Sequence, residues 1–292
     1  MKRRTFIGTS VAATLAAKTA FAGGMPKMVR PIGVQLYTVR DAMKSDFEGT
    51  VAKVAATGYK EVEFAGYFNK SPKDIRAILD KNGLAAPSCH VPYSTLEKSW
   101  PEALEAANVI GHKLIVNPWI EVEQRNSADG WKKAAELFNK CGESAKKAGI
   151  QFAYHNHTFE FQQANGLDGK LPYDYLLANC DKNLVKMELD LCWITVAGKD
   201  PIKYFNENPG RFPAVHVKDI KQLPKPEDAP TAGPDRQMGF LTDVGSGVIP
   251  WKDIFANAGK AGIQHYFVEH DQPKSPFDSL RNSFQYLEKL RF

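Results

Sequence analysis

Helical patterns in this chain repeatedly end at a glycine, and a β-branched or aromatic run follows at once. Five copies are clear in the sequence: ATGYKEVEF, KNGLAAPSCH, VIGHKLIVNPW, KAGIQFAYHNH and KAGIQHYFVEH. Their glycines stand where the residue after a helix adopts a left-handed conformation, which glycine tolerates without steric cost. These are Gly58, Gly83, Gly111, Gly149 and Gly262. The pattern predicts a strand directly after each helix.

Runs of this kind predict eight strands, near residues 32–38, 60–65, 86–91, 113–118, 151–157, 185–190, 213–217 and 265–270. Helical patterns separate them; in SPKDIRAILDKNG, Ser71 is the expected N-cap and Pro72 begins the helix. Strict alternation is typical of a parallel sheet, and eight units favour closure into a single-domain α/β fold, the (β/α)8 or TIM barrel. The alternative is an open doubly wound sheet, which is disfavoured because no glycine-rich phosphate loop follows the first strand, IGVQLYTVRD.

The long gap before the last strand contains a Pro- and Gly-rich segment, KQLPKPEDAPTAGPDRQMGFLTDVGSG, from Lys221 to Gly247. Because it follows the seventh strand, a barrel would place it on the C-terminal face, as a lid or substrate loop. An unstructured insertion is the alternative reading.

The first residues, MKRRTFIGTS, carry the pair Arg3-Arg4 ahead of a mildly apolar stretch and the small-residue pattern AFAGG. This predicts a twin-arginine signal peptide over residues 1–22, a barrel over residues 23–292, and a periplasmic or otherwise exported protein. Removing residues 1–22 lowers the 38 basic residues to 34 against 33 acidic ones. The near-neutral remainder argues against a nucleic-acid partner, and no apolar stretch predicts membrane insertion after cleavage.

Strands of a parallel barrel are buried on both faces and are expected to be apolar, but several here end in polar residues. Pairs separated by one residue lie on the same side of a strand. They are Glu61/Glu63, His155/His157, Glu188/Asp190, His216/Lys218 and Glu269/Asp271, and His90 closes the third strand. Catalytic residues of barrels come from the C-terminal ends of several strands, so six such strands indicate a functional site.

The residue types favour one divalent metal ion, Mn²⁺, Zn²⁺, Co²⁺ or Mg²⁺, held by oxygen ligands and imidazole. The four cysteines have no CxxC spacing, which argues against a structural zinc site. Taking one ligand from each of the last four strands gives Glu160, Asp190, His216 and Glu269. Glu160 lies three positions past His157, so the chain must turn or bulge for it to reach the ion. His155 is the substitute ligand.

Five motifs, YHNHTFEF, MELDLCW, AVHVKD, GSGVIPWKDIF and YFVEHD, resemble in this order the xylose-isomerase-like barrel superfamily. The resemblance covers about residues 30–290, and the group includes sugar (phosphate) isomerases and epimerases, inosose dehydratases, hydroxypyruvate isomerases and endonuclease IV. It implies a metal held by acidic residues of strands five, six and eight and a histidine of strand seven, which Asp190, His216 and Glu269 match. Many members have Glu-x-His on strand five, whereas this chain has His155-Asn156-His157, a form that resembles a branch acting on 3-keto-glycosides. Members of this superfamily often form dimers, so the resemblance allows a homodimer, and the sequence itself does not indicate the oligomeric state.

Isomerisation, epimerisation and elimination of a sugar all begin with removal of a proton next to a carbonyl. A divalent cation stabilises the resulting enediolate, and a carboxylate moves the proton. We expect Glu269 or Glu160 as the base. The expected contacts to substrate are as follows: His157, His90, His155 and Lys218 bind oxygens, Glu63 holds a hydroxyl or orients a histidine, and Trp119 and Trp193 pack on a sugar face or fill the core.

The expected substrate is a free or glycosidic keto-sugar, because sugar phosphates are largely cytoplasmic and no phosphate-binding loop is evident. One rival, a DNA-repair endonuclease, needs further ligands, including a histidine at the position of Trp193. The other rival is a non-catalytic periplasmic sugar-binding protein on the same barrel. The intact set of predicted metal ligands weighs against it.

Overall fold

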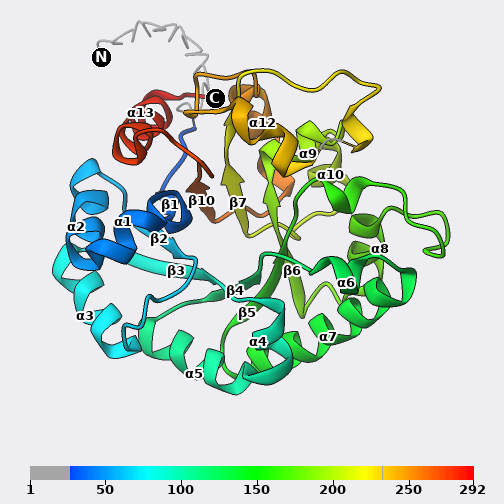
Figure 1. The fold of residues 1–292 in the computed structure, drawn as a ribbon, viewed down its shortest axis with the longest axis horizontal. Helices are drawn as coiled ribbons and strands as arrows, with labels where there is room; N and C mark the ends of the chain where they lie inside the picture. Colours follow the sequence, from blue (N-terminus) through cyan, green and yellow to red (C-terminus); the bar gives the residue numbers. More distant parts are fainter. Residues whose placement is uncertain (1–26, 232) are drawn as a thin grey trace, which may run out of the picture.

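The computed structural model describes residues 27–231 and 233–292, so the predicted signal peptide lies outside the described residues. Eight parallel strands close into a barrel in the order β1-β10-β7-β6-β5-β4-β3-β2, and helices surround them (Figure 1). The strands are β1 (Ile32–Gln35), β2 (Glu61–Phe64), β3 (Ala85–His90), β4 (Leu114–Asn117), β5 (Gln151–His155), β6 (Val185–Asp190), β7 (Ala214–Val217) and β10 (His265–Val268). The predicted TIM barrel and its eight strands are confirmed.

The predicted and observed strands differ mainly at their C-terminal ends. β1 ends at Gln35 because its side chain accepts a hydrogen bond from the Tyr37 backbone N–H, 3.0 Å away. That bond begins a 3-10 turn, η1 (Leu36–Val39), which bends the chain out of the sheet. β5 likewise ends at His155, two residues before its predicted end.

The helices between the strands begin and end as their sequence signals predict. Ser71 accepts a hydrogen bond from the Asp74 backbone N–H at 3.2 Å, and Pro72 begins α3. Gly58 ends α2 with φ +118°. No described helix has the length and apolarity to cross a bilayer. The α-helices are α1 (Arg40–Ser45), α2 (Phe47–Thr57), α3 (Pro72–Asn82), α4 (Tyr93–Lys98), α5 (Trp100–Ile110), α6 (Val122–Arg125), α7 (Ala128–Lys147), α8 (Pro172–Asn179), α9 (Leu191–Val196), α10 (Pro201–Glu207), α11 (Pro234–Gln237), α12 (Trp251–Ala256) and α13 (Pro276–Lys289).

The main hydrophobic core lies between the strands and the helices. On β5, Phe152 and Tyr154 pack against Phe138 of α7, with ring centroids 5.4 and 5.2 Å away. Successive side chains of a strand point to opposite faces, so Ala153 and His155 point into the barrel. Sequence alternation therefore decides which β5 side chains are available to a site inside the barrel.

The segment from Lys221 to Gly247 is folded against the barrel. Its strand β9 (Leu241–Thr242) pairs antiparallel with β8 (Asp219–Ile220), directly after β7. It also contributes Pro234 and Met238 to the lining of the cavity described below. The β8–β9 pairing and the two lining residues support the interpretation of this segment as a lid or substrate loop.

Candidate metal centre and active site

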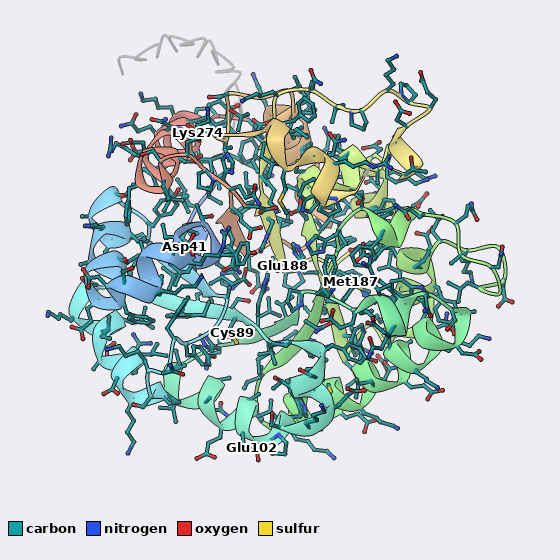
Figure 2. All side chains as sticks on the ribbon, viewed as in Figure 1. Asp41, Cys89, Glu102, Met187, Glu188 and Lys274 are labelled. Atoms are coloured by element: carbon teal, nitrogen blue, oxygen red, sulfur yellow. The ribbon has the colours of Figure 1, made fainter. Side chains whose placement is uncertain are left out.

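Strand register brings the predicted polar residues together at the C-terminal ends of the barrel strands. Asp190 of β6 is aligned with His216 of β7, and His155 of β5 is aligned with Glu188 of β6. Figure 2 shows Glu188 near the middle of the barrel. Two groups result that share His216: a mouth cluster of Asp190, His216 and Glu269, and an inner cluster of His90, His155, Glu188 and His216.

The mouth cluster surrounds the ammonium group of Lys218. His216 Nδ1 lies 2.9 Å from Glu269 Oε2, which is also 2.9 Å from Lys218 Nζ. Lys218 Nζ lies 3.2 Å from Asp190 Oδ2 and 2.8 Å from Asp271 Oδ1. All five side chains are buried. Three carboxylates thus lie around one ammonium group.

Burial and these charges shift the pKa values of Glu269 and of its neighbours Lys218 and Asp271 in different directions. Burial alone would lower the pKa of Lys218, but Asp190, Asp271 and Glu269 outweigh it and raise that pKa well above its usual value. Burial likewise opposes ionisation of Glu269, yet the Lys218 and His216 charges lower its pKa overall. Asp271 is different, because burial dominates and raises its pKa to about 6. Asp271 is therefore suited to exchange a proton near neutral pH.

The inner cluster is a hydrogen-bonded network of imidazoles and carboxylates. Glu188 Oε2 lies 2.9 Å from His90 Nε2, 3.2 Å from His216 Nε2 and 3.4 Å from His155 Nδ1. Glu63 Oε2 lies 2.8 Å from His216 Nε2. Burial opposes a charge on His90, but Glu63 and Glu188 outweigh it and raise its pKa to about 9. Protonated His90 therefore offsets carboxylate charge inside the barrel.

Glu63 is itself held by two residues that the sequence reading did not select. Gln35 Nε2 donates to its Oε2 at 2.8 Å, and the Ser88 hydroxyl donates to its Oε1. The register explains both contacts, because Gln35 and Ser88 are the strand neighbours of Glu63 on β1 and β3. The only sequence signal was a polar residue inside an otherwise apolar strand.

The residues of the mouth cluster fit a divalent cation. Two carboxylates and one imidazole are suitable ligands for Mn²⁺, Zn²⁺, Co²⁺ or Mg²⁺. Asp190 Oδ1 accepts from the backbone N–H groups of Cys192 and Trp193, which fixes its orientation. Its buried Oδ2 faces the Lys218 ammonium group, 3.2 Å away. A carboxylate that is oriented through one oxygen, and whose other oxygen already faces a cation of the protein, is suited to bind a metal ion.

A cavity of about 400 Å³ opens above both clusters, and most of the predicted substrate-binding residues line it. Lys218, Glu269 and Asp271 contribute polar atoms to its wall. The predicted contacts His90, His155, His157 and Trp119 also line it. The cavity therefore joins the metal-ligand candidates to groups that can bind a polar small molecule.

Glu160 lies elsewhere and does not join the other three predicted ligands. The chain turns after β5 into a 3-10 helix, η2 (Phe159–Phe161), which directs the Glu160 carboxylate toward Tyr154. The Tyr154 hydroxyl donates to its Oε1, and the His157 backbone N–H donates to its Oε2 at 2.9 Å. Both oxygens are thus occupied on the side of β5 that faces α7. The substitute, His155, belongs to the inner cluster.

The buried position of Glu160 predicts a pH-dependent stability. Burial outweighs its hydrogen bonds and raises its pKa from 4.5 to about 7. The protonated form is favoured in the folded state, so stability is greatest below the unfolded pKa and falls as the pH rises through about 7. We expect the free energy of unfolding to lose on the order of 1–3 kcal/mol between pH 5 and pH 8 through this group. Urea unfolding across this range measures the loss.

The variant Glu160→Gln should remove this part of the pH dependence, because glutamine resembles the protonated acid in shape and hydrogen bonding. Glu207→Gln, at an exposed carboxylate on α10, is the matched control and should leave the profile unchanged. Equal pH profiles for Glu160→Gln and the unmodified protein would contradict the prediction.

Three other predicted residues lie outside the cavity wall: Glu63, which binds His216 instead of lining the cavity, Trp193 and Glu61. Trp193 is fully buried in α9, and Lys218 Nζ lies 4.9 Å from the centre of its ring. Trp193 therefore packs against Lys218 from the core side, as the core-filling interpretation predicts. Glu61 points into the barrel but binds His265 Nδ1 at 2.8 Å near the N-terminal ends of the strands. Its distance along β2 from Glu63 separates it from the cavity.

Comparison with known proteins gives one family over most of the chain. The family described as Xylose isomerase-like TIM barrel matches residues 51–290. An inosose dehydratase from Clostridium beijerinckii is 26% identical over 294 residues, covering 89% of this chain and 93% of its own. A crystal structure of a sugar phosphate isomerase/epimerase from Parabacteroides distasonis is 26% identical with a TM-score of 0.72, covering 94% of this chain and 97% of that one.

A third similarity extends only to the fold. The crystal structure of the IOLI protein with a bound zinc atom has a TM-score of 0.68 and 11% identity. It covers 87% of this chain and 95% of that chain.

Proposed function

The chain belongs to the xylose isomerase-like TIM barrel family, and we propose that it is a divalent-metal-dependent enzyme that removes a proton next to a sugar carbonyl. The observation that carries the proposal is the mouth cluster, whose member Glu269 lines the first cavity together with Lys218 and Asp271. Sugar isomerases, epimerases and inosose dehydratases among the similar proteins support this chemistry. All three reactions share the enolising first step.

Asp190, His216 and Glu269 would hold the metal ion. The bound zinc atom of the IOLI protein, which has the same fold, supports a divalent ion in a barrel of this kind. When bound, a divalent ion supplies Lewis-acid stabilisation to negatively charged oxygens of the substrate. The protein residues prepare the site for it. Backbone donors orient Asp190, and Glu63 fixes the His216 ring through Nε2, leaving Nδ1 directed at the mouth cluster.

Glu269 and Asp271 are the proposed proton-transfer residues. Glu269 is ionised because the Lys218 and His216 charges lower its pKa, so it can accept a proton. Asp271 has a pKa of about 6 and can supply a proton to an oxygen or carbon of the intermediate. Lys218 contacts both carboxylates and would stabilise negative charge on the substrate.

His90, His155 and His157 would bind substrate oxygens along the cavity wall. Burial and neighbouring positive charges lower the pKa of His155 and of His157, so each ring is neutral and can both donate and accept hydrogen bonds. A neutral, hydroxyl-rich substrate suits these groups. We therefore propose a free or glycosidic keto-sugar, encountered after export through the signal of residues 1–22.

Metal content tests the proposal and also separates the two clusters. We expect about one equivalent of Mn, Zn, Co or Mg in mature protein purified without chelator, measured by elemental analysis. Asp190→Ala alters only the mouth cluster, His155→Ala only the inner cluster, and His216→Ala both. The expected result is that Asp190→Ala and His216→Ala lose the metal, whereas His155→Ala keeps it.

A metal lost from His155→Ala but kept by Asp190→Ala would move the metal site to the inner cluster. Protein that contains no metal and takes none up on dialysis would overturn the mechanism and favour a sugar-binding protein. Exchange of the sugar α-proton with deuterium, followed by NMR on the metal-loaded protein, tests the chemical step directly.

A further inference from the structure

A second cavity, of about 390 Å³, lies beside the first. Trp119 and Pro234 line both cavities, so the two cavities adjoin at these residues. The lining of the second cavity comes from the loop after β4, from α6, α7 and α8, from the turn after β5 and from the segment between Lys221 and Gly247, none of which contributes to the mouth cluster. A molecule long enough to span Trp119 would therefore reach both cavities.

Aromatic faces and polar groups alternate around this second cavity. Trp119 and Phe159 meet edge to face with centroids 4.9 Å apart, and Trp131 lies behind Phe159. The Arg125 guanidinium stacks on Phe159, with Cζ 3.5 Å from the ring centre. Asn126, Gln162 and Gln163 add amide groups. Aromatic faces bounded by amide and guanidinium donors suit a sugar ring, which has apolar C–H faces and a hydroxyl rim.

Two polar atoms of this cavity's lining residues are left without partners by the protein itself. Thr158 is 1% exposed, and its hydroxyl has no hydrogen-bond partner among the described residues. Arg125 Nε is likewise buried and unpartnered within the described chain. Unsatisfied buried donors and acceptors are costly, and a ligand carrying hydroxyl groups would satisfy them.

We propose that the second cavity is a subsite for a second sugar unit, so that the substrate is a two-ring glycoside whose reacting ring occupies the first cavity. This inference rests on the proposed function, because the reacting ring is placed by the mouth cluster. Trp119 separates the two units, and Arg125 and Thr158 bind hydroxyls of the second one. Such an arrangement selects for length as well as for the identity of the reacting ring.

Isothermal titration of the metal-loaded mature protein tests the subsite without requiring turnover. The probes are glucose as a single ring, then cellobiose, maltose and gentiobiose as two-ring sugars, and phenyl β-glucoside as a sugar with an aromatic group. We expect at least one disaccharide to bind about tenfold or more tightly than glucose. Arg125→Met should remove most of that gain and leave glucose binding within about twofold, because methionine keeps the stem but loses the donors.

Arg281→Met, at an exposed arginine of α13, is the matched control and should change neither affinity. Disaccharides that bind no tighter than glucose, or an Arg125→Met variant that weakens both equally, would overturn the subsite. A gain for phenyl β-glucoside alone would also overturn it, in favour of an aromatic occupant. Because titration reports binding only, an Arg125-dependent gain without metal or proton exchange would sustain the subsite and reject the proposed function.

Discussion

Replacing Glu269 by glutamine is expected to lower kcat for α-proton exchange by about 10²–10⁴-fold, the range for loss of a positioned acid–base group. Glutamine has nearly the same shape, so the effect isolates the loss of charge and basicity. Glu269 Oε2 contacts His216 Nδ1 and Lys218 Nζ, both at 2.9 Å. A neutral amide leaves both cations less compensated, so weaker metal binding is expected in addition.

Kinetics at saturating metal separate these two effects of Glu269→Gln. If the loss of kcat persists when metal content is restored, Glu269 moves the proton; if it disappears, Glu269 serves as a ligand. Glu61→Gln is the matched control, because Glu61 is a carboxylate of the same barrel whose partner is His265 at the opposite end. Full turnover by metal-loaded Glu269→Gln would remove Glu269 from the base role, and Asp271→Asn would then be the next variant.

The sequence predicts the barrel and most of its site because both depend on short-range periodicity. Helix-ending glycines with positive φ, such as Gly58 and Gly83, mark where each strand begins. Alternation along a strand then determines which side chains face the interior, and a parallel barrel brings all C-terminal ends to one mouth. His216 and Glu269 could be placed together on that basis although 53 positions separate them.

The remaining features depend on backbone turns and contacts that periodicity does not encode. The position of Glu160 depends on the turn after His155 and on a hydroxyl donor, Tyr154, on the outer side of β5. Asp271 formed a visible pair with Glu269, but only its burial, which raises its pKa, distinguishes it as a proton-transfer candidate. Gln35 needed the register of β1 against β2 before its role beside Glu63 could be recognised.

Asp219, which follows β7, links the barrel to the C-terminal end of the segment from Lys221 to Gly247 and to the residues just after it. Its side chain is fully buried, and Oδ1 accepts from the backbone N–H groups of Ile220 and Ile249 at 2.9 and 3.2 Å. Oδ2 accepts from the Trp251 indole at 2.9 Å and from the backbone N–H groups of Gly245 and Gly247. One carboxylate thus satisfies five donors, of which the Ile220 and Ile249 backbone N–H groups and the Trp251 indole are buried.

Asp219→Ala is therefore expected to lower the free energy of unfolding by about 3–5 kcal/mol, because several buried donors lose their acceptor together. Urea unfolding should give a lower midpoint with an unchanged slope. Asp41→Ala removes an exposed aspartate that pairs with Lys44 and should cost less than about 0.5 kcal/mol. If Asp219→Ala lowered the free energy of unfolding as little as Asp41→Ala, water would have to satisfy these donors. The segment from Lys221 to Gly247 would then be held by its apolar contacts instead. A large loss would identify Asp219 as the residue that fixes this segment, and with it the Met238 side of the cavity, in place.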